Sequence, residues 1–91
     1  MKVKIYTKLK ESVLDPQGQA VIGGLKNLGF KTVKSVRIGK VIDIIQDDMP
    51  VKEAQAQIKK MCEQLLANTV IEDYSFTFEI DGKSYTDKSV I

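Results

Sequence analysis

The residues of this chain that could take part in chemistry are few and widely spaced. The 91 residues include one cysteine, Cys62, and no histidine, so the commonest general base and zinc ligand are missing. Cys62 falls on the apolar side of a helical pattern, which predicts a small buried residue rather than a reactive thiol. No Ser-His, Cys-His or paired-carboxylate constellation can be assembled. We therefore expect no catalytic residue, metal or cofactor on this chain.

One short stretch, Asp15 to Gly18, has the composition of a helix start that could also meet a ligand or a partner. Asp15 can cap a helix by accepting a hydrogen bond from a free backbone N–H, and Pro16 suits the first helical position. A helix N-terminus carries unsatisfied N–H groups and a partial positive charge, so Pro16, Gln17 and Gly18 could meet an anion or a partner's carbonyl groups. The alternative interpretation is a helix cap with no further role.

Composition and charge indicate an ordinary globular protein of one domain over residues 1–91. Hydrophobic residues make up 43% of the chain and charged residues 29%, which excludes a disordered chain. The apolar runs are too short for a membrane span, and the start lacks the apolar block of a signal peptide, so we expect a cytoplasmic location. The net charge is +2 and 13 of the 14 basic residues are lysine, which does not favour nucleic-acid binding.

The elements that would position these residues begin with a strand and a helix. Residues 2–10 alternate between apolar and polar side chains, which predicts a strand. From Pro16, apolar residues recur every three or four positions, which predicts a helix of about 13 residues that ends near Gly29. Gly23 and Gly24 lie inside this helix, where each costs roughly 1 kcal/mol relative to alanine. Their presence predicts that a strand or a partner surface packs closely there.

The remaining residues predict three more strands and a second helix. Residues 32–46 are rich in valine and isoleucine and are predicted to form two strands joined by a hairpin around Gly39. A helix follows Pro50, and its apolar stripe is formed by Val51, Ala54, Ile58, Met61 and Leu65. Residues 70–80 alternate again, with aromatic side chains on one face. Residues 81–91 begin with an Asp-Gly turn signal and form either a short added strand or a tail.

This order predicts an α+β ferredoxin-like β-α-β-β-α-β fold, a four-stranded antiparallel sheet with two helices on one face. Its usual strand order places the strand at 41–45 in the centre, in agreement with apolar residues at both parities. The open face of the sheet is then a candidate dimer contact. Because this fold hosts many functions, function has to be argued from sites.

Three segments resemble, in order and spacing, the PurS subunit of phosphoribosylformylglycinamidine synthase. They are residues 10–18 (KESVLDPQG), 36–40 (VRIGK) and 62–74 (CEQLLANTVIEDY), and the resemblance covers residues 1 to about 80. It implies a non-catalytic subunit of a three-part enzyme of de novo purine synthesis. In that family a glutaminase subunit releases ammonia, and a large synthetase subunit uses it with ATP and Mg to convert formylglycinamide ribonucleotide to the amidine.

The resemblance also implies partners and interface residues. The small subunit is expected to form a homodimer or higher homo-oligomer, to bridge the glutaminase and synthetase subunits, and to help ammonia pass between them. The candidate interface residues are Asp15, Pro16, Gln17, Gly18, Arg37, Gly39, Lys40, Asn68, Glu72 and Asp73. Each also has a structural interpretation as a helix cap, a hairpin turn, or a helix stop followed by a strand. Arg37 is the foremost candidate, since arginine at the tip of a tight turn can pair with a partner's carboxylate.

Two other classes of function stay open at this point. Ferredoxin-like domains also serve as amino-acid sensors that bind a small ligand at a dimer interface, although such sensors are usually attached to a catalytic domain. An isolated small enzyme is disfavoured by the missing catalytic groups. Co-purification with a glutaminase and a synthetase would support the bridge, whereas tight binding of a free ligand would support the sensor.

Overall fold

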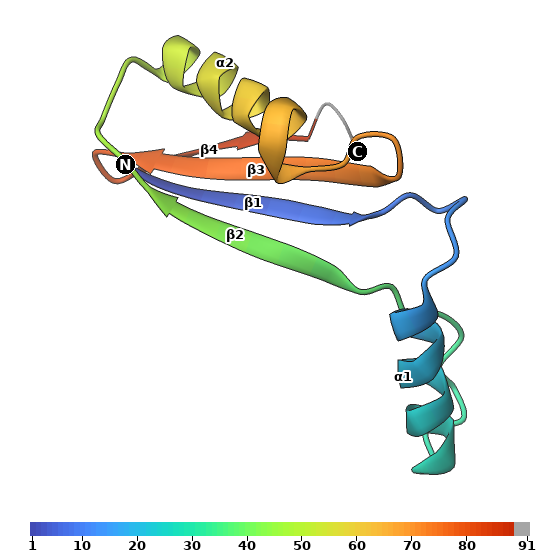
Figure 1. The fold of residues 1–91 in the computed structure, drawn as a ribbon. Helices are drawn as coiled ribbons and strands as arrows, with labels where there is room; N and C mark the ends of the chain where they lie inside the picture. Colours follow the sequence, from blue (N-terminus) through green and yellow to red (C-terminus); the bar gives the residue numbers. More distant parts are fainter. Residues whose placement is uncertain (89–91) are drawn as a thin grey trace.

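The computed structural model describes residues 1–88 and contains one antiparallel sheet and two α-helices. The strands are β1 (Lys2–Leu9), β2 (Gly39–Ile45), β3 (Glu72–Ile80) and β4 (Lys83–Asp87), and their order across the sheet is β2-β1-β3-β4. The helices are α1 (Pro16–Asn27) and α2 (Val51–Met61), and a π-helical turn, η1 (Cys62–Leu66), continues α2. Figure 1 shows α2 lying along one face of the sheet and α1 extending beyond the end of the sheet.

The hydrophobic core lies between α2 and the face of the sheet that it covers. Alternation along β1 turns Val3 and Ile5 toward this face, and both are buried. Phe76 of β3 packs beside them, while α2 contributes Ala54 and Ile58, neither of which is exposed. The predicted strand alternation and the predicted helical stripe thus meet in one core.

The predicted fold class, an α+β fold with a four-stranded antiparallel sheet and two helices, is confirmed, but one strand has a different origin. Residues 32–37 form no strand, so the predicted hairpin around Gly39 is wrong. The fourth strand is instead β4, which pairs with β3. Of the two alternatives for residues 81–91, residues 83–87 therefore form the short added strand. Residues 89–91 lie outside the described residues. As a result β2 is an edge strand rather than a central one. The apolar residues of β2 lie on both of its faces because Ile42 and Ile44 face the core, whereas Val41 and Ile45 are exposed on the outer face.

Helix α1 does not cover the sheet, contrary to the expectation that both helices lie on one face (Figure 1). The segment 28–35 returns beside it, and we call α1 together with this segment the arm. Leu28 and Phe30 of the arm are 75% and 56% exposed. The radius of gyration is 16.1 Å, compared with about 12 Å for a compact domain of this length. The arm therefore makes the molecule extended.

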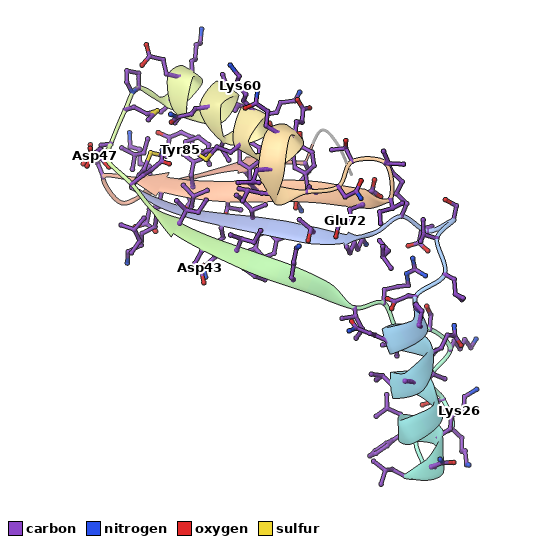
Figure 2. The ribbon with its side chains drawn as sticks, viewed as in Figure 1. Lys26, Asp43, Asp47, Lys60, Glu72 and Tyr85 are labelled. Atoms are coloured by element: carbon purple, nitrogen blue, oxygen red, sulfur yellow. The ribbon has the colours of Figure 1, made fainter. Side chains whose placement is uncertain are left out.

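The face of the sheet opposite α2 is charged along β1, whereas the exposed apolar residues on this side, Val41 and Ile45, lie on the edge strand β2. Lysines at alternate positions of β1 point to this side, and Lys4 Nζ lies 2.8 Å from Asp43 Oδ1. Figure 2 shows Asp43 projecting from the sheet on the side away from α2. Such a surface gives little hydrophobic driving force for the dimer contact predicted at this face. None of the helices in the described part of the chain combines the length and apolarity needed to cross a membrane.

Candidate partner interface

The predicted interface residues lie in two groups at one end of the sheet. The first group, which we call the hinge, comprises residues 9–18 and 36–39, where the chain leaves β1 for the arm and returns to β2. The second group is the turn of residues 67–72 that joins η1 to β3, which we call the Asn68 turn. A backbone hydrogen bond from Lys10 N to Ile71 O, 2.8 Å long, joins the two groups. The sequence motifs thus converge in space although they are far apart in the chain.

Asp15 connects the two segments of the hinge, residues 9–18 and 36–39. Its side chain is only 2% exposed; Oδ1 accepts a hydrogen bond from Gly18 N at 2.9 Å and Oδ2 accepts one from Ile38 N at 2.7 Å. The first bond is the predicted helix cap, which is confirmed. These donors, Ile38 N–H first and then Gly18 N–H, hold the pKa of the Asp15 carboxyl below its ordinary value. One ionised carboxylate therefore fixes the start of α1 to the start of β2.

Two glycines allow the backbones of the hinge to approach each other closely. A Cβ atom on Gly18 would overlap the carbonyl oxygen of Val36, and a Cβ on Gly39 would lie 2.5 Å from the carbonyl oxygen of Thr7. Neither position requires a left-handed backbone. The glycines of these motifs are therefore needed for contact between chain segments rather than for a turn conformation.

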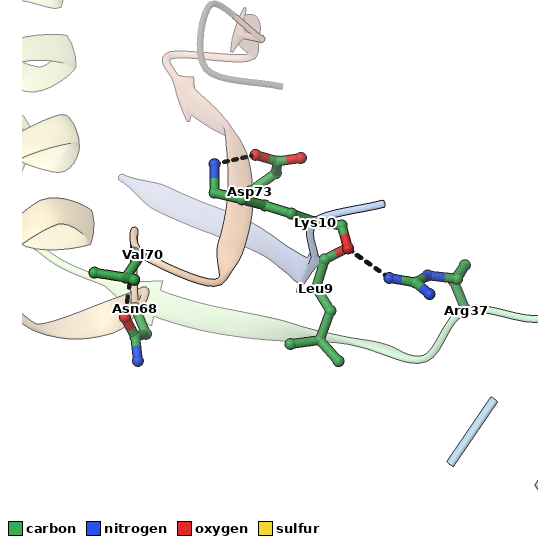
Figure 3. Close-up of polar contacts among 6 residues, drawn as sticks. All are labelled: Leu9, Lys10, Arg37, Asn68, Val70 and Asp73. Atoms are coloured by element: carbon green, nitrogen blue, oxygen red, sulfur yellow. Dashed lines mark hydrogen bonds and ion pairs between the residues drawn. The ribbon is translucent and has the colours of Figure 1, made fainter. Parts of the chain in front are cut away.

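Arg37 binds the backbone of its own chain. Its Nη2 donates to the carbonyl oxygens of Lys10 at 2.7 Å, Val13 at 2.8 Å and Leu9 at 3.3 Å, and Figure 3 shows the guanidinium group directed at the end of β1. The predicted position at a hairpin tip is wrong, because the hairpin does not form. Arg37 therefore acts first as a clamp on the connection between β1 and α1. Its contact with a partner stays a prediction.

The Asn68 turn is held by its own side chains and backbone. Asn68 N donates to Glu72 Oε1 at 2.7 Å, Val70 N donates to Asn68 Oδ1 at 3.2 Å, and the N–H groups of Ile71 and Glu72 donate to the carbonyl oxygen of Asn68. Figure 3 shows Val70 and Asn68 together at this turn. The predicted stop of the second helix before Asn68 is confirmed. A side chain that bonds the backbone two residues ahead makes a defined turn.

A polar cavity of about 430 Å³ lies between the hinge and the Asn68 turn. Lys10 Nζ lies 3.0 Å from Asp73 Oδ1 (Figure 3), and the Tyr74 hydroxyl donates to Glu63 Oε1 at 3.1 Å. Burial first, and then the Glu63 carboxylate, raise the pKa of Tyr74 to about 12, so its hydroxyl stays a donor at neutral pH. The lining residues are Lys10, Glu63, Thr69, Glu72, Asp73 and Tyr74.

Other predicted interface residues lie at the edges of these groups. Pro16 and Gln17 are exposed at the start of α1, and Lys40 is exposed on β2. Gln17 and Lys40, with Gly39 and Asp15, line a second, smaller cavity of about 190 Å³ at the hinge. The structure therefore places all ten predicted residues in or beside the two groups, which makes them a continuous region without assigning a partner to any of them.

Leu65 is a residue that the sequence pattern placed wrongly. Its spacing from Ile58 and Met61 predicts a buried position, but it is 83% exposed. The reason is η1, in which Ala67 N donates to the carbonyl oxygen of Cys62, five residues earlier, at 2.9 Å. This wider turn changes which residues face the sheet. Two adjacent leucines, Leu65 and Leu66, give no sequence signal for such a change in period.

Cys62 and the acidic residues do not form a reactive or metal-binding centre. Cys62 is completely buried, as predicted, and burial raises the pKa of its thiol to about 11. Over residues 1–88, no three histidine, cysteine or acidic side chains gather closely enough to hold a metal ion. The region of the candidate interface residues is a set of hydrogen-bonded turns beside one end of the sheet.

Residues 2–80 match the family model of PurS, described as phosphoribosylformylglycinamidine (FGAM) synthase. This match includes the hinge, the Asn68 turn and the whole of β1, α1, β2, α2 and β3. The chain belongs to the PurS family. The predicted family, and with it the predicted role as a subunit of this purine-biosynthetic ligase, are confirmed.

Relatives and solved structures agree with this membership. The chain is 49% identical to subunit PurS of phosphoribosylformylglycinamidine synthase from Bacillus subtilis (strain 168), over 86% of this chain and 92% of the relative. It matches a chain of PurLQS from Thermotoga maritima with a TM-score of 0.74 at 32% identity, covering 82% of this chain and 92% of that one. The Methanocaldococcus jannaschii PurS, one of the subunits of formylglycinamide ribonucleotide amidotransferase, matches with a TM-score of 0.72 at 36% identity, covering 96% and 95%. The amino-acid sensor alternative is therefore not favoured.

Proposed function

We propose that this chain is the non-catalytic subunit that bridges the glutaminase and the ATP-dependent synthetase subunits of FGAM synthase in the cytoplasm. The proposal is supported by membership of the PurS family and by the similarity to a chain of the Thermotoga maritima PurLQS structure. In this role glutamine hydrolysis and the use of ATP and Mg belong to the partner subunits. The small subunit contributes binding surfaces and fixed geometry.

The observation that carries the proposal is the arm, which is firmly attached but packs on no face of its own sheet. Asp15 and Arg37 fix where α1 leaves the hinge, so the helix is directed rather than loosely tethered. Its apolar residues Leu28 and Phe30 remain exposed. A helix of this kind gains stability only when another chain covers it.

The edge strand β2 offers a matching surface for a second copy of this chain. Ile42 and Ile44 face the same side as α2 but are only half-buried, and Val41 and Ile45 are exposed on the other side. A symmetric dimer in which each copy places its arm against β2 of the other would cover both surfaces and protect the sheet edge. A homodimer built in this way presents two copies of the hinge and of the Asn68 turn.

A bridge of this kind also assists ammonia transfer by fixing the distance between two active sites. Ammonia that escapes is diluted or protonated, so a defined geometry that excludes water favours its capture by the synthetase. The hydrogen-bonded hinge and Asn68 turn supply that rigidity on this chain. They require no cofactor of their own.

The decisive experiment measures amidine formation by the glutaminase and synthetase subunits with and without this chain. We expect the glutamine-driven reaction to require the chain and the ammonia-driven reaction to proceed without it. Sedimentation of the isolated chain checks the dimer. If neither reaction responds to the chain, the bridging role is wrong.

A further inference from the structure

Two large apolar side chains flank the turn between η1 and β3 and are almost fully exposed. Leu65 is 83% exposed and Val70 is 81% exposed. The π-helical turn η1 leaves Leu65 exposed. Such turns are rare in proteins, and those that occur are often found at functional sites. Ile71, next to Val70, is also exposed. The chain therefore presents apolar side chains here that its own core does not use.

The turn that carries Val70 is already fixed in one conformation. Val70 N donates to Asn68 Oδ1 (Figure 3). Glu72 N donates to the carbonyl oxygen of Asn68, and Glu72 Oε1 accepts a bond from Asn68 N. A surface that is ordered before binding loses little conformational entropy when a partner docks. Exposed apolar side chains on a rigid turn are thus suited to recognition.

The cavity described above is lined in part by residues of the same two segments, Glu63 of η1 and Thr69 and Glu72 of the Asn68 turn, and its charge is predominantly negative. Glu63, Glu72 and Asp73 contribute three carboxylates against the one ammonium group of Lys10. The contacts with Tyr74, Asn68 and Lys10 each occupy one oxygen of the carboxylate concerned. Buried Tyr74 forms an apolar wall, which strengthens the field inside the cavity. A cationic group fits this environment, and an anion does not.

We infer that Leu65, Val70 and Ile71, with the cavity beside them, form a docking surface for a non-identical subunit that inserts a lysine or arginine side chain surrounded by apolar ones. The inference rests on the proposed function, because it names the part of the chain that meets another subunit of the synthase. The apolar side chains supply the contact area, and the cavity selects the positive charge.

The docking surface is separate from the surfaces assigned to the second copy. Figure 1 shows the turn between η1 and β3 on the same side of the sheet as α2, whereas α1 leaves the sheet end on the opposite side. A dimer joined through its arms would therefore leave the docking surface of each copy open. One chain can hold its second copy and another subunit at the same time.

The test compares two double variants, each of which replaces two exposed apolar side chains with serine. Leu65→Ser with Val70→Ser removes the docking side chains, and Val41→Ser with Ile45→Ser changes the exposed pair on β2. Affinity for the purified glutaminase subunit and for the purified synthetase subunit is measured separately by calorimetry, and self-association is measured by sedimentation. We expect the first variant to bind one of the two subunits about tenfold more weakly, or worse, with unchanged self-association. The Val41 and Ile45 variant should lose self-association but keep the affinity of each chain for the glutaminase and synthetase subunits.

A second pair of variants tests the charge of the cavity. Glu63→Gln keeps an acceptor for the Tyr74 hydroxyl but removes one negative charge, and Glu79→Gln is the control on the opposite face of the sheet. We expect Glu63→Gln to weaken binding to the same subunit by about threefold and to flatten its dependence on salt between about 50 and about 500 mM. Glu79→Gln should change neither quantity.

The outcomes separate this inference from the proposed function. If the unaltered chain binds neither subunit, the bridging role fails and the docking surface fails with it. If the unaltered chain binds but the Leu65 and Val70 variant binds equally well, or loses self-association instead, only the docking surface is wrong. Equal effects of Glu63→Gln and Glu79→Gln would overturn the insertion of a basic side chain.

Discussion

The body of the molecule, which is the sheet with α2, and the arm contain similar apolar residues but use them in opposite ways. In the body, Phe76 and Ile58 have no exposed surface. In the arm, Leu28 and Phe30 remain largely exposed although the arm has a complete helix with a cap. The body therefore buries its apolar side chains within its own chain, whereas the arm leaves much of its apolar surface exposed. In the proposed function, the body supplies stability and the arm supplies assembly.

The largest expected effect is loss of stability from a core substitution. Phe76→Ala removes a fully buried ring and should lower the free energy of unfolding by about 3 to 5 kcal/mol. Leu28→Ala in the arm should change the stability of the monomer by less than about 0.5 kcal/mol. Urea unfolding at several chain concentrations measures both, since only a substitution at the dimer contact changes the concentration dependence. A large loss for Leu28→Ala at the lowest concentration would contradict this division.

The next effect in size concerns the clamp between the body and the arm. Arg37→Lys keeps the charge, but its side chain is one atom shorter and does not carry an N–H group to the position of Nη2, the nitrogen that donates to all three carbonyl oxygens. We expect a loss of about 1 to 3 kcal/mol in thermal or urea unfolding. Lys40→Ala, at an exposed position on β2, is the control and should be nearly neutral. Equal stability of the two variants would mean that the guanidinium contacts do not hold the hinge.

A smaller and pH-dependent effect is expected at Asp15. Asp15→Asn keeps a side-chain acceptor for the cap, but its amide nitrogen cannot also accept the bond from Ile38 N. The midpoint of thermal unfolding should fall by a few degrees near neutral pH. Because the pKa of Asp15 in the folded chain is below its ordinary value of 3.8, its stabilisation is present above that value and is lost as the pH falls through the lower folded pKa. The two chains should therefore converge in stability once the pH is low enough to protonate Asp15 in the folded chain; a difference that persists beyond that point would contradict the role of the charge.

Structural features that depend on residues close together in the chain could be predicted from the sequence. Strand alternation in β1 and β3, the Asp15 cap, and the glycine after α1 all depend on contacts within a few residues. Gly29 has the predicted left-handed backbone, with φ of 102°, and the Asp81-Gly82 turn also has positive φ at both residues. Both groups of candidate interface residues contain turns with strong local signals, and their contact with a partner stays a prediction.

Two of the differences from prediction, at residues 32–37 and at α1, involve long-range contacts, and the third, at Leu65, is local. Residues 32–37 have the composition of a strand, but Arg37 and Ile38 are hydrogen-bonded to residues 10–15 at the other side of the hinge. The sequence gives no signal for the carbonyl groups that Arg37 contacts. The exposure of Leu65 depends on the hydrogen bonding of η1, in which the spacing between donor and acceptor is five residues, as from Ala67 N to Cys62 O. The position of α1 also differs, because α1 does not pack on the sheet of its own chain as a compact fold would require (Figure 1).

The smallest expected effect has opposite signs in the free chain and in the dimer, and it tests the comparison between body and arm most directly. A Cβ at Gly23 would meet no described atom within 4 Å, so Gly23→Ala should stabilise α1 by about 0.5 to 1 kcal/mol in the free chain. If a second copy packs closely on this part of α1, the added methyl group should weaken self-association at the same time. Circular dichroism at low concentration and sedimentation across a concentration series measure the two effects, and Gln19→Ala, at an exposed position on the same helix, is the control. If Gly23→Ala raises helicity but leaves self-association unchanged, the dimer contact does not involve this part of α1. Gly23 would then have no packing role in the assembly.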